Sequence, residues 1–153
     1  MPCRHVRRVL LAVILTTPIA ALSIAQTGQS AVAAIQAATN GQFKSAKGKY
    51  FSKDCNEQVD YEAEAIDLNG DGQLEVFTKE YGSCIGGRTG VHMNLYIKTK
   101  AGLWKAQFGF PGMYKILTTQ SKGYPDIEIG GPGTCFPIWR WDGQKYDIHK
   151  KCR

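Results

Sequence analysis

The stretch Asp67–Glu75 separates two segments in which polar and apolar residues alternate, and this combination constrains the fold most strongly. The alternation runs from Gln58 to Ile66 and resumes from Leu74 to Tyr81. A period of two is typical of β-strands, whereas helices repeat every 3.6 residues or so. The pattern therefore predicts a strand, a loop and a second strand that pairs back on the first.

The loop itself carries oxygen-bearing side chains at alternate positions, with Gly70 and Gly72 between them to allow a tight backbone. Ca²⁺ takes about six to eight oxygen ligands in a flexible shell. Carboxylates held close together without a cation would repel one another. The sequence thus predicts a calcium site formed by the side chains of Asp67, Asn69, Asp71 and Glu75 and the carbonyl of Gln73.

Two alternatives apply to the same loop. Asn-Gly and Asp-Gly are strong tight-turn dipeptides, so the loop can also be a hairpin connection without an ion. An EF-hand is disfavoured, because its twelfth loop position falls on Thr78 and its flanks would have to be helices. The motif instead resembles the strand-flanked calcium loops of FG-GAP and VCBS-type β modules. It is also similar to a group of small exported bacterial proteins that carry Asp-Leu-Asn-Gly-Asp-Gly and end in a Trp/Phe-Asp-Gly-x-x-Tyr hairpin.

The N-terminus has the pattern of a secretory signal peptide. Arg4, Arg7 and Arg8 precede an apolar run from Val9 to Ile24, and small residues follow at Ala25. We expect residues 1–25 to be removed, with Ala33 as a second possible cleavage position. The apolar run is too short for a membrane anchor. The expected product is periplasmic or secreted, with no membrane attachment after cleavage.

The net charge and the length of the chain after the signal peptide limit its possible partners and the size of its core. Loss of the three arginines lowers the Lys and Arg count from 19 to 16, which against 13 Asp and Glu leaves a net charge of +3. The lysines are scattered and form no basic stripe with aromatic residues, so a nucleic-acid partner is not expected. The mature chain of about 128 residues is long enough for one domain with a modest core.

Four cysteines remain after the signal peptide, and an even number in an exported chain predicts disulfides. In the hairpin around Asp67, paired positions sum to about 140, which places Cys55 nearly opposite Cys84. If Asp142-Gly143 turns the last hairpin, pairs sum to about 285 and Cys135 lies close to Cys152. Both bridges are therefore predicted. A zinc site is disfavoured, because the cysteine spacing is wrong and no histidine accompanies it.

The rest of the chain also alternates in short segments separated by Gly- and Pro-rich turns. We expect residues 26–57 to form a partly helical or irregular segment and residues 58–153 to form a β domain. The predicted fold class is all-β: a single-domain antiparallel meander of about eight short strands, forming either a curved sheet or a small open barrel. Trp139 and Trp141 share one strand face and are expected in the core.

No catalytic signature is present, so the protein is not expected to be an enzyme. Glu62 and Glu64 as a glycosidase pair is the weaker alternative. His92 and His149 lie on strands and are expected to be exposed.

A glycine-rich loop between two strands is the other candidate site. Its backbone N–H groups could hold an anion with Arg88 as counter-charge, or its glycines could only relieve backbone strain. It is also a possible contact surface for a partner protein. The residues concerned are Gly82, Ser83, Gly86, Gly87, Arg88 and Gly90.

Two functions follow as expectations. The first is an exported calcium-binding β module with a binding or structural role. The second is a periplasmic inhibitor or immunity-like protein that acts on a cell-wall hydrolase. In the second case the partner is a periplasmic or secreted protein, and the Gly82–Gly90 loop is the element that inserts into it.

Overall fold

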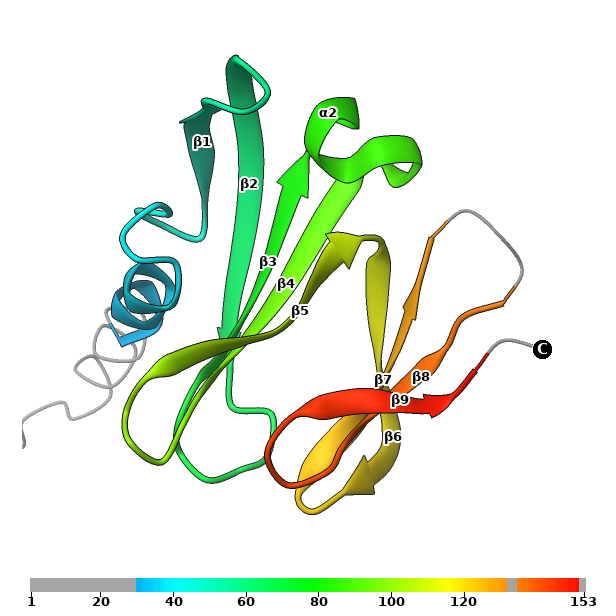
Figure 1. Cartoon of the computed structure of the whole chain (residues 1–153). Coiled ribbons are helices and arrows are strands. Elements are labelled where there is room, and N and C mark those ends of the chain that lie inside the picture. Colours follow the sequence, from blue (N-terminus) through cyan, green and yellow to red (C-terminus); the bar gives the residue numbers. More distant parts are fainter. Residues whose placement is uncertain (1–29, 132–134, 152–153) are drawn as a thin grey trace, which may run out of the picture.

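The computed structural model describes residues 30–131 and 135–151, and within these ranges it contains nine antiparallel strands in two open sheets (Figure 1). Each sheet follows the order of the chain. The first sheet contains β1 (Lys47–Ser52), β2 (Glu57–Ile66), β3 (Glu75–Tyr81), β4 (Val91–Lys98) and β5 (Trp104–Pro111). The second contains β6 (Met113–Ser121), β7 (Tyr124–Gly130), β8 (Ile138–Trp141) and β9 (Tyr146–Lys150).

The predicted all-β antiparallel meander is confirmed, with one strand more than expected. β1 is the additional strand. It was not predicted, because its sequence has lysines and glycine where a half-buried strand would have apolar residues. It forms an edge of the first sheet and pairs only with β2. The segment before Gln58 also contributes a short helix, residues 30–38, as the alanine-rich sequence suggests.

The break between the sheets falls at Pro111 and Gly112. Proline has no N–H for the ladder, and a side chain at Gly112 would lie 2.8 Å from the carbonyl oxygen of Gly130. Glycine therefore lets the chain turn close against β7 and start the second sheet.

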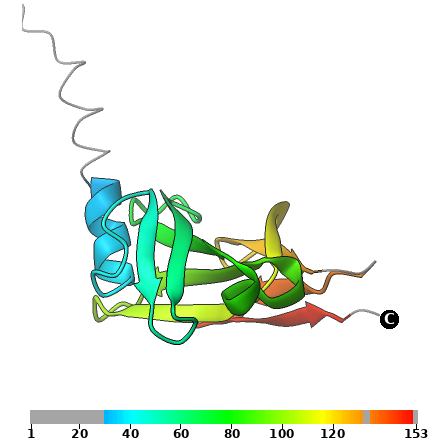
Figure 2. The ribbon, with the colours of Figure 1, turned by 90° about the horizontal axis from the view of Figure 1, so that it is seen from above.

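The first sheet is covered on both faces, and β3 is its most buried strand. Val76 packs toward the N-terminal helix with Ile35 and Phe43, while Phe77 packs toward the second sheet with Met93 and Ile127. The helix and the second sheet lie on opposite sides of the first sheet (Figures 1 and 2). This double burial explains why consecutive residues of β3 are buried, including polar ones, instead of every second residue.

A β-bulge brings the two sheets together at one edge. Leu95 pairs with Phe108 and Tyr96 with Ala106, which leaves Gln107 as the extra residue of β5. Its side-chain oxygen accepts a hydrogen bond from the backbone N–H of Tyr146 in β9 at 3.2 Å. The bulge thus links the edge strands of both sheets.

The two predicted hairpin registers have different outcomes. In β2 and β3 the paired positions run from Asp60–Tyr81 to Ile66–Glu75, as expected. In β8 and β9, Trp141 pairs with Tyr146, so the predicted register is wrong by two. Asp142 precedes the turn and its carboxylate accepts the N–H groups of Gln144 and Lys145, which moves the turn centre to Gly143–Gln144.

Candidate functional site

The Asp67–Glu75 loop connects β2 to β3 as the alternating pattern predicts. Gly70 and Gly72 adopt positive φ angles of 75° and 84°, which only glycine accepts without strain. Asp67 occupies the centre of the turn: its Oδ1 accepts the backbone N–H groups of Gly70 and Asp71 at 2.8 and 3.1 Å, and its Oδ2 accepts that of Gly72 at 2.8 Å. The loop backbone is therefore organised around one carboxylate.

The next two predicted ligands are hydrogen-bonded to each other. Asn69 donates its amide to Asp71 Oδ2 at 3.0 Å and accepts the Asp71 backbone N–H at 3.1 Å. Asp71 Oδ1 accepts the backbone N–H of Gln73 at 2.8 Å. Both Asp71 and Gln73 are exposed, so their remaining lone pairs face solvent.

Glu75 differs from these residues, because its side chain is buried with only 2% of the residue exposed. Its Oε2 accepts the backbone N–H of Leu68 at 2.8 Å, and its Oε1 accepts the Tyr124 hydroxyl at 3.0 Å. Burial raises the pKa of Glu75, the two hydrogen bonds lower it in part, and the charges of Asp71 and Asp67 raise it further. Among the described residues, no cationic side chain forms an ion pair with it.

The oxygen atoms of these residues are ligands that suit calcium, but their carboxylates lie farther apart than the ligands of one ion. Each carboxylate has about four lone-pair sites, so Asp67, Asp71 and Glu75 each keep at least one free. The three carboxylates do not lie within 4.8 Å of one another. The separation of the carboxylates and their hydrogen bonds to nearby donors reduce the repulsion between their charges. A bound ion would require the three carboxylates to move closer together.

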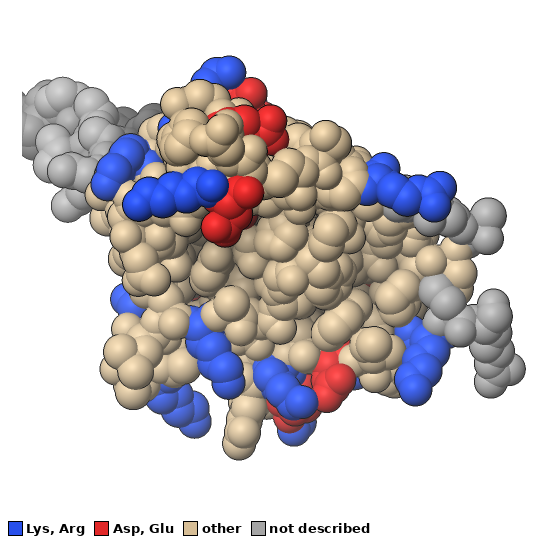
Figure 3. Space-filling model, turned by 45° about the horizontal axis from the view of Figure 1, so that its top comes forward, with Lys and Arg blue, Asp and Glu red and all other residues tan. Residues whose placement is uncertain are grey.

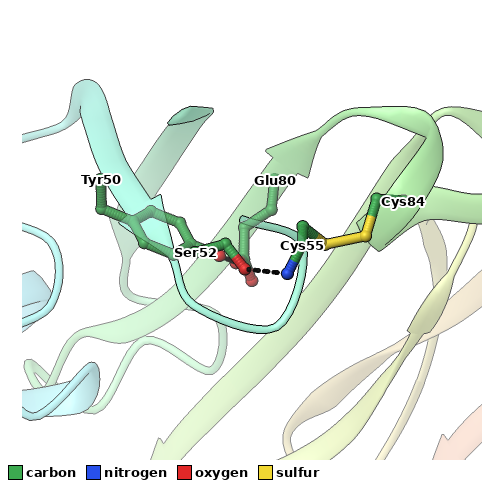
Figure 4. Close-up of a disulfide and its surroundings, with 5 residues drawn as sticks. All are labelled: Tyr50, Ser52, Cys55, Glu80 and Cys84. Carbon is green, nitrogen blue, oxygen red and sulfur yellow. Dashed lines mark hydrogen bonds between the residues drawn. A yellow bond between two sulfur atoms is a disulfide. The ribbon is translucent and has the colours of Figure 1, made fainter. Parts of the chain in front are cut away.

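Within the described residues, the one group of potential metal ligands that lies within 4.8 Å is Cys55, Glu57 and Cys84. Its two sulfurs are bonded to each other at 2.03 Å, so they are not available as ligands. This disulfide confirms the predicted Cys55–Cys84 bridge and links the β1–β2 turn to the start of α2 (Ser83–Gly86) (Figure 4). The predicted Cys135–Cys152 bridge includes Cys152, which lies outside the described residues, as does the predicted signal peptide.

The Gly82–Gly90 loop is folded into α2 followed by the short 3₁₀ helix η1 (Gly87–Thr89). The backbone N–H groups of Gly82, Gly86 and Gly90 donate to carbonyl oxygens within the loop at 2.8 to 3.2 Å. They are therefore already paired and do not point together at an anion. A side chain at Gly86 would lie 2.1 Å from the backbone nitrogen of Val91, so glycine permits close packing there. Ser83 and Arg88 are exposed.

A polar cluster that the sequence does not reveal lies on the helix-facing side of the first sheet. Glu80 accepts hydrogen bonds from the Tyr50 hydroxyl and, at 3.4 Å, from the Asn94 amide. His92 Nδ1 lies 3.6 Å from Glu80 Oε1, and its side chain is 23% exposed. The expectation that His92 is exposed is therefore wrong. Burial and the bond to Glu80 raise the pKa of Tyr50 (Figure 4 shows both side chains).

This cluster could not be found from spacing, because its members come from different strands. The one signal for it is the period of two in β3, which places Glu80 on the same strand face as the buried Val76 and Thr78. Trp141 is buried and Trp139 packs against the same core, as predicted. His149 is exposed, as expected. Glu62 accepts hydrogen bonds from Lys47 and Tyr81, so its carboxylate is held in a surface network.

The loop lies at the end of the molecule where several hairpin turns gather (Figure 1). Residues of these turns line a cleft of about 580 Å³. Asn69 and Asp71 form one wall, and the β4–β5 hairpin forms another with Lys98, Lys100 and Lys105. Tyr124 and Trp141 of the second sheet lie at its base. On the face that Figure 3 shows, Lys and Arg side chains are scattered over uncharged surface, and some of them lie beside Asp or Glu.

Comparison with family models, curated proteins and solved structures finds no match for this chain. No helix in the described ranges is long and apolar enough to cross a membrane. The Cys55–Cys84 disulfide suggests an oxidising, extracytoplasmic environment, in which such bonds persist.

Proposed function

We propose that this protein is an exported β module that binds Ca²⁺ through the Asp67–Glu75 loop, and that the ion stabilises the junction of its two sheets. The observation that carries the proposal is the buried carboxylate of Glu75, which has hydrogen-bond donors but no cationic partner among the described residues. Burying a charge is costly unless it is paired. A cation in the adjacent loop would supply the missing counter-charge.

The ion would be held by the side chains of Asp67, Asn69, Asp71 and Glu75 and by the carbonyl of Gln73. Because the carboxylates have to approach one another on binding, the expected affinity is weak, with a Kd on the order of 10⁻⁴–10⁻³ M. Mg²⁺ should bind less well, since it requires a tighter octahedron and dehydrates reluctantly. An exported protein meets calcium in this range more readily than a cytosolic one.

Thermal unfolding of the disulfide-intact exported chain tests this function. Millimolar Ca²⁺ should raise the Tm relative to chelator, because the ion at about one to ten times Kd adds about 0.4–1.4 kcal/mol of stability. Asp71→Asn removes one ligand charge from an exposed position and should abolish the difference. Asp54→Asn removes an exposed carboxylate elsewhere and should leave the difference unchanged. Identical melting in both buffers, with no heat of binding in calorimetry, would show that the loop is a turn that does not bind calcium.

The hydrolase inhibitor is the second candidate, and the Gly82–Gly90 loop supports it. The disulfide and the internal hydrogen bonds hold this loop in one conformation while Arg88 is exposed. A rigid exposed element loses little conformational entropy on binding, which favours tight association.

Capture of hydrolases from a periplasmic extract, followed by activity assays, separates the two functions. An inhibitor should suppress the captured enzyme, and Arg88→Ala should relieve the suppression while Asp71→Asn does not. A calcium module without this role should leave the hydrolase activity unchanged.

A further inference from the structure

The cleft beside the calcium loop has the size of a small-molecule site. Its volume of about 580 Å³ falls within the range of roughly 300–1,000 Å³ typical of ligand pockets. Three turns that are distant in sequence form it, so only the packing of both sheets creates it. Two aromatic side chains, Tyr124 and Trp141, lie 4.7 Å apart between ring centroids and form a firm base.

The charge of the cleft is strongly one-sided. Lys100 and Lys105 line it together with Lys98, whose ammonium lies 5.4 Å from the centre of the Trp104 ring, against the single carboxylate of Asp71. The ion pairs found among the described residues involve other groups, so none of these lysines is neutralised by a neighbouring carboxylate. Lysines that converge on a concave surface raise the local concentration of anions.

The uncharged part of the lining favours a hydroxyl-rich ligand. Gln73 and Gln144 line the cleft with side-chain amides, which both donate and accept hydrogen bonds. Thr99 adds a hydroxyl on the lysine side. Such groups match sugar hydroxyls, while the lysines match an anionic substituent.

We propose that this cleft binds a small acidic saccharide, with its carboxylate against Lys100 and Lys105 and its hydroxyls on the amide side chains. The carboxylate of Asp71 alone repels an anionic ligand, whereas a calcium ion bound at Asn69 and Asp71 would attract it. The saccharide should therefore bind more tightly with the ion present. This calcium dependence rests on the proposed function. The lysine contacts do not.

Isothermal titration calorimetry on the disulfide-intact exported chain tests the proposal with a trimer of galacturonic acid as the probe. We expect binding in millimolar Ca²⁺ and weaker binding in chelator. The neutral trimer of glucose and inorganic phosphate should both bind at least about tenfold more weakly. The double variant Lys100→Gln/Lys105→Gln should lose about tenfold in affinity. The matched control Lys115→Gln/Lys150→Gln, at exposed positions outside the cleft, should bind as the unaltered chain does.

The outcomes separate the cleft from the ion. Absence of binding by the acidic trimer, equal binding of inorganic phosphate or the neutral trimer, or an unaffected Lys100/Lys105 variant would each overturn the cleft proposal. If calcium itself gives no heat and the acidic trimer binds equally in both buffers, the proposed calcium function fails while the cleft stands. If calcium binds and the trimer does not, the cleft proposal alone fails.

Discussion

The hydroxyl of Tyr124 donates a hydrogen bond of 3.0 Å to the carboxylate of Glu75, and this contact joins residues 49 positions apart in two different sheets. Burial, together with the charge of Glu75, raises the pKa of Tyr124, so the phenol remains a donor at neutral pH. The same contact connects the calcium loop to the second sheet. An ion bound by Glu75 would therefore affect the whole sheet junction.

Replacement of Glu75 by glutamine should stabilise the protein in chelator and remove its calcium response. Glutamine can accept the Leu68 N–H and donate to Tyr124, and it lacks the negative charge whose burial is costly. Because the folded-state pKa of Glu75 is raised, its favourable contribution is complete below 4.5 and is lost as the pH rises through the folded value. Urea unfolding in chelator should show this loss in the unaltered chain and not in Glu75→Gln. A destabilised variant at neutral pH would contradict the assignment.

Arg140→Met should be strongly destabilising, because removal of one partner leaves the other charge buried and unpaired. Asp126 is only 1% exposed, and Arg140 binds it through two hydrogen bonds of 2.8 and 2.6 Å. The variant would leave a buried carboxylate without its cation. Urea unfolding at neutral pH measures the loss, and Lys145→Met is the control. Lys145 pairs with Asp147 in solvent, so its removal should change the urea midpoint much less than Arg140→Met does.

Acid should weaken the protein through the same pair. The hydrogen bonds from Arg140 hold the pKa of Asp126 below its usual 3.8. Its contribution is therefore present above 3.8 and is lost as the pH falls through the folded value. A pH series of urea midpoints should decline in this range, and Arg140→Met should flatten the decline. An unchanged slope in the variant would rule out Asp126 as the group responsible.

The disulfide Cys55–Cys84 should contribute roughly 2–4 kcal/mol to stability, since it closes a loop of 29 residues. Replacement of both cysteines by alanine, compared with the oxidised chain in urea, measures this contribution. Peptide mapping without reduction should yield the Cys55–Cys84 linkage and the predicted Cys135–Cys152 linkage. A peptide joining Cys55 to Cys135 would contradict both.

Cleavage of the signal peptide should occur after Ala25 and not after Ala33. A chain that begins at Gln26 retains all of the helical residues 30–38, of which Ile35 and Ala38 are buried against the first sheet. Cleavage after Ala33 would remove its first residues. N-terminal sequencing of the exported protein distinguishes the two positions, and retention of Met1 would show that no signal peptide is removed.

The amino-acid sequence alone determined the local structure of this protein. Alternating residues specified the strands, Asn-Gly and Asp-Gly specified the turn of the first hairpin, and its register placed Cys55 opposite Cys84, because strand pairing depends on residues near in sequence. The last hairpin was harder to predict, since two hydrogen bonds to the Asp142 carboxylate moved its turn.

Only the tertiary structure decided the relations between distant segments. The position of β1, the contact of Glu75 with Tyr124, the cluster around Glu80 and the lysine-lined cleft all depend on which faces pack together. Local periodicity assigns a residue to a face but does not say which element covers that face. Burial by a remote strand makes Glu75 an internal carboxylate, whereas its sequence position makes it only the last oxygen of a loop.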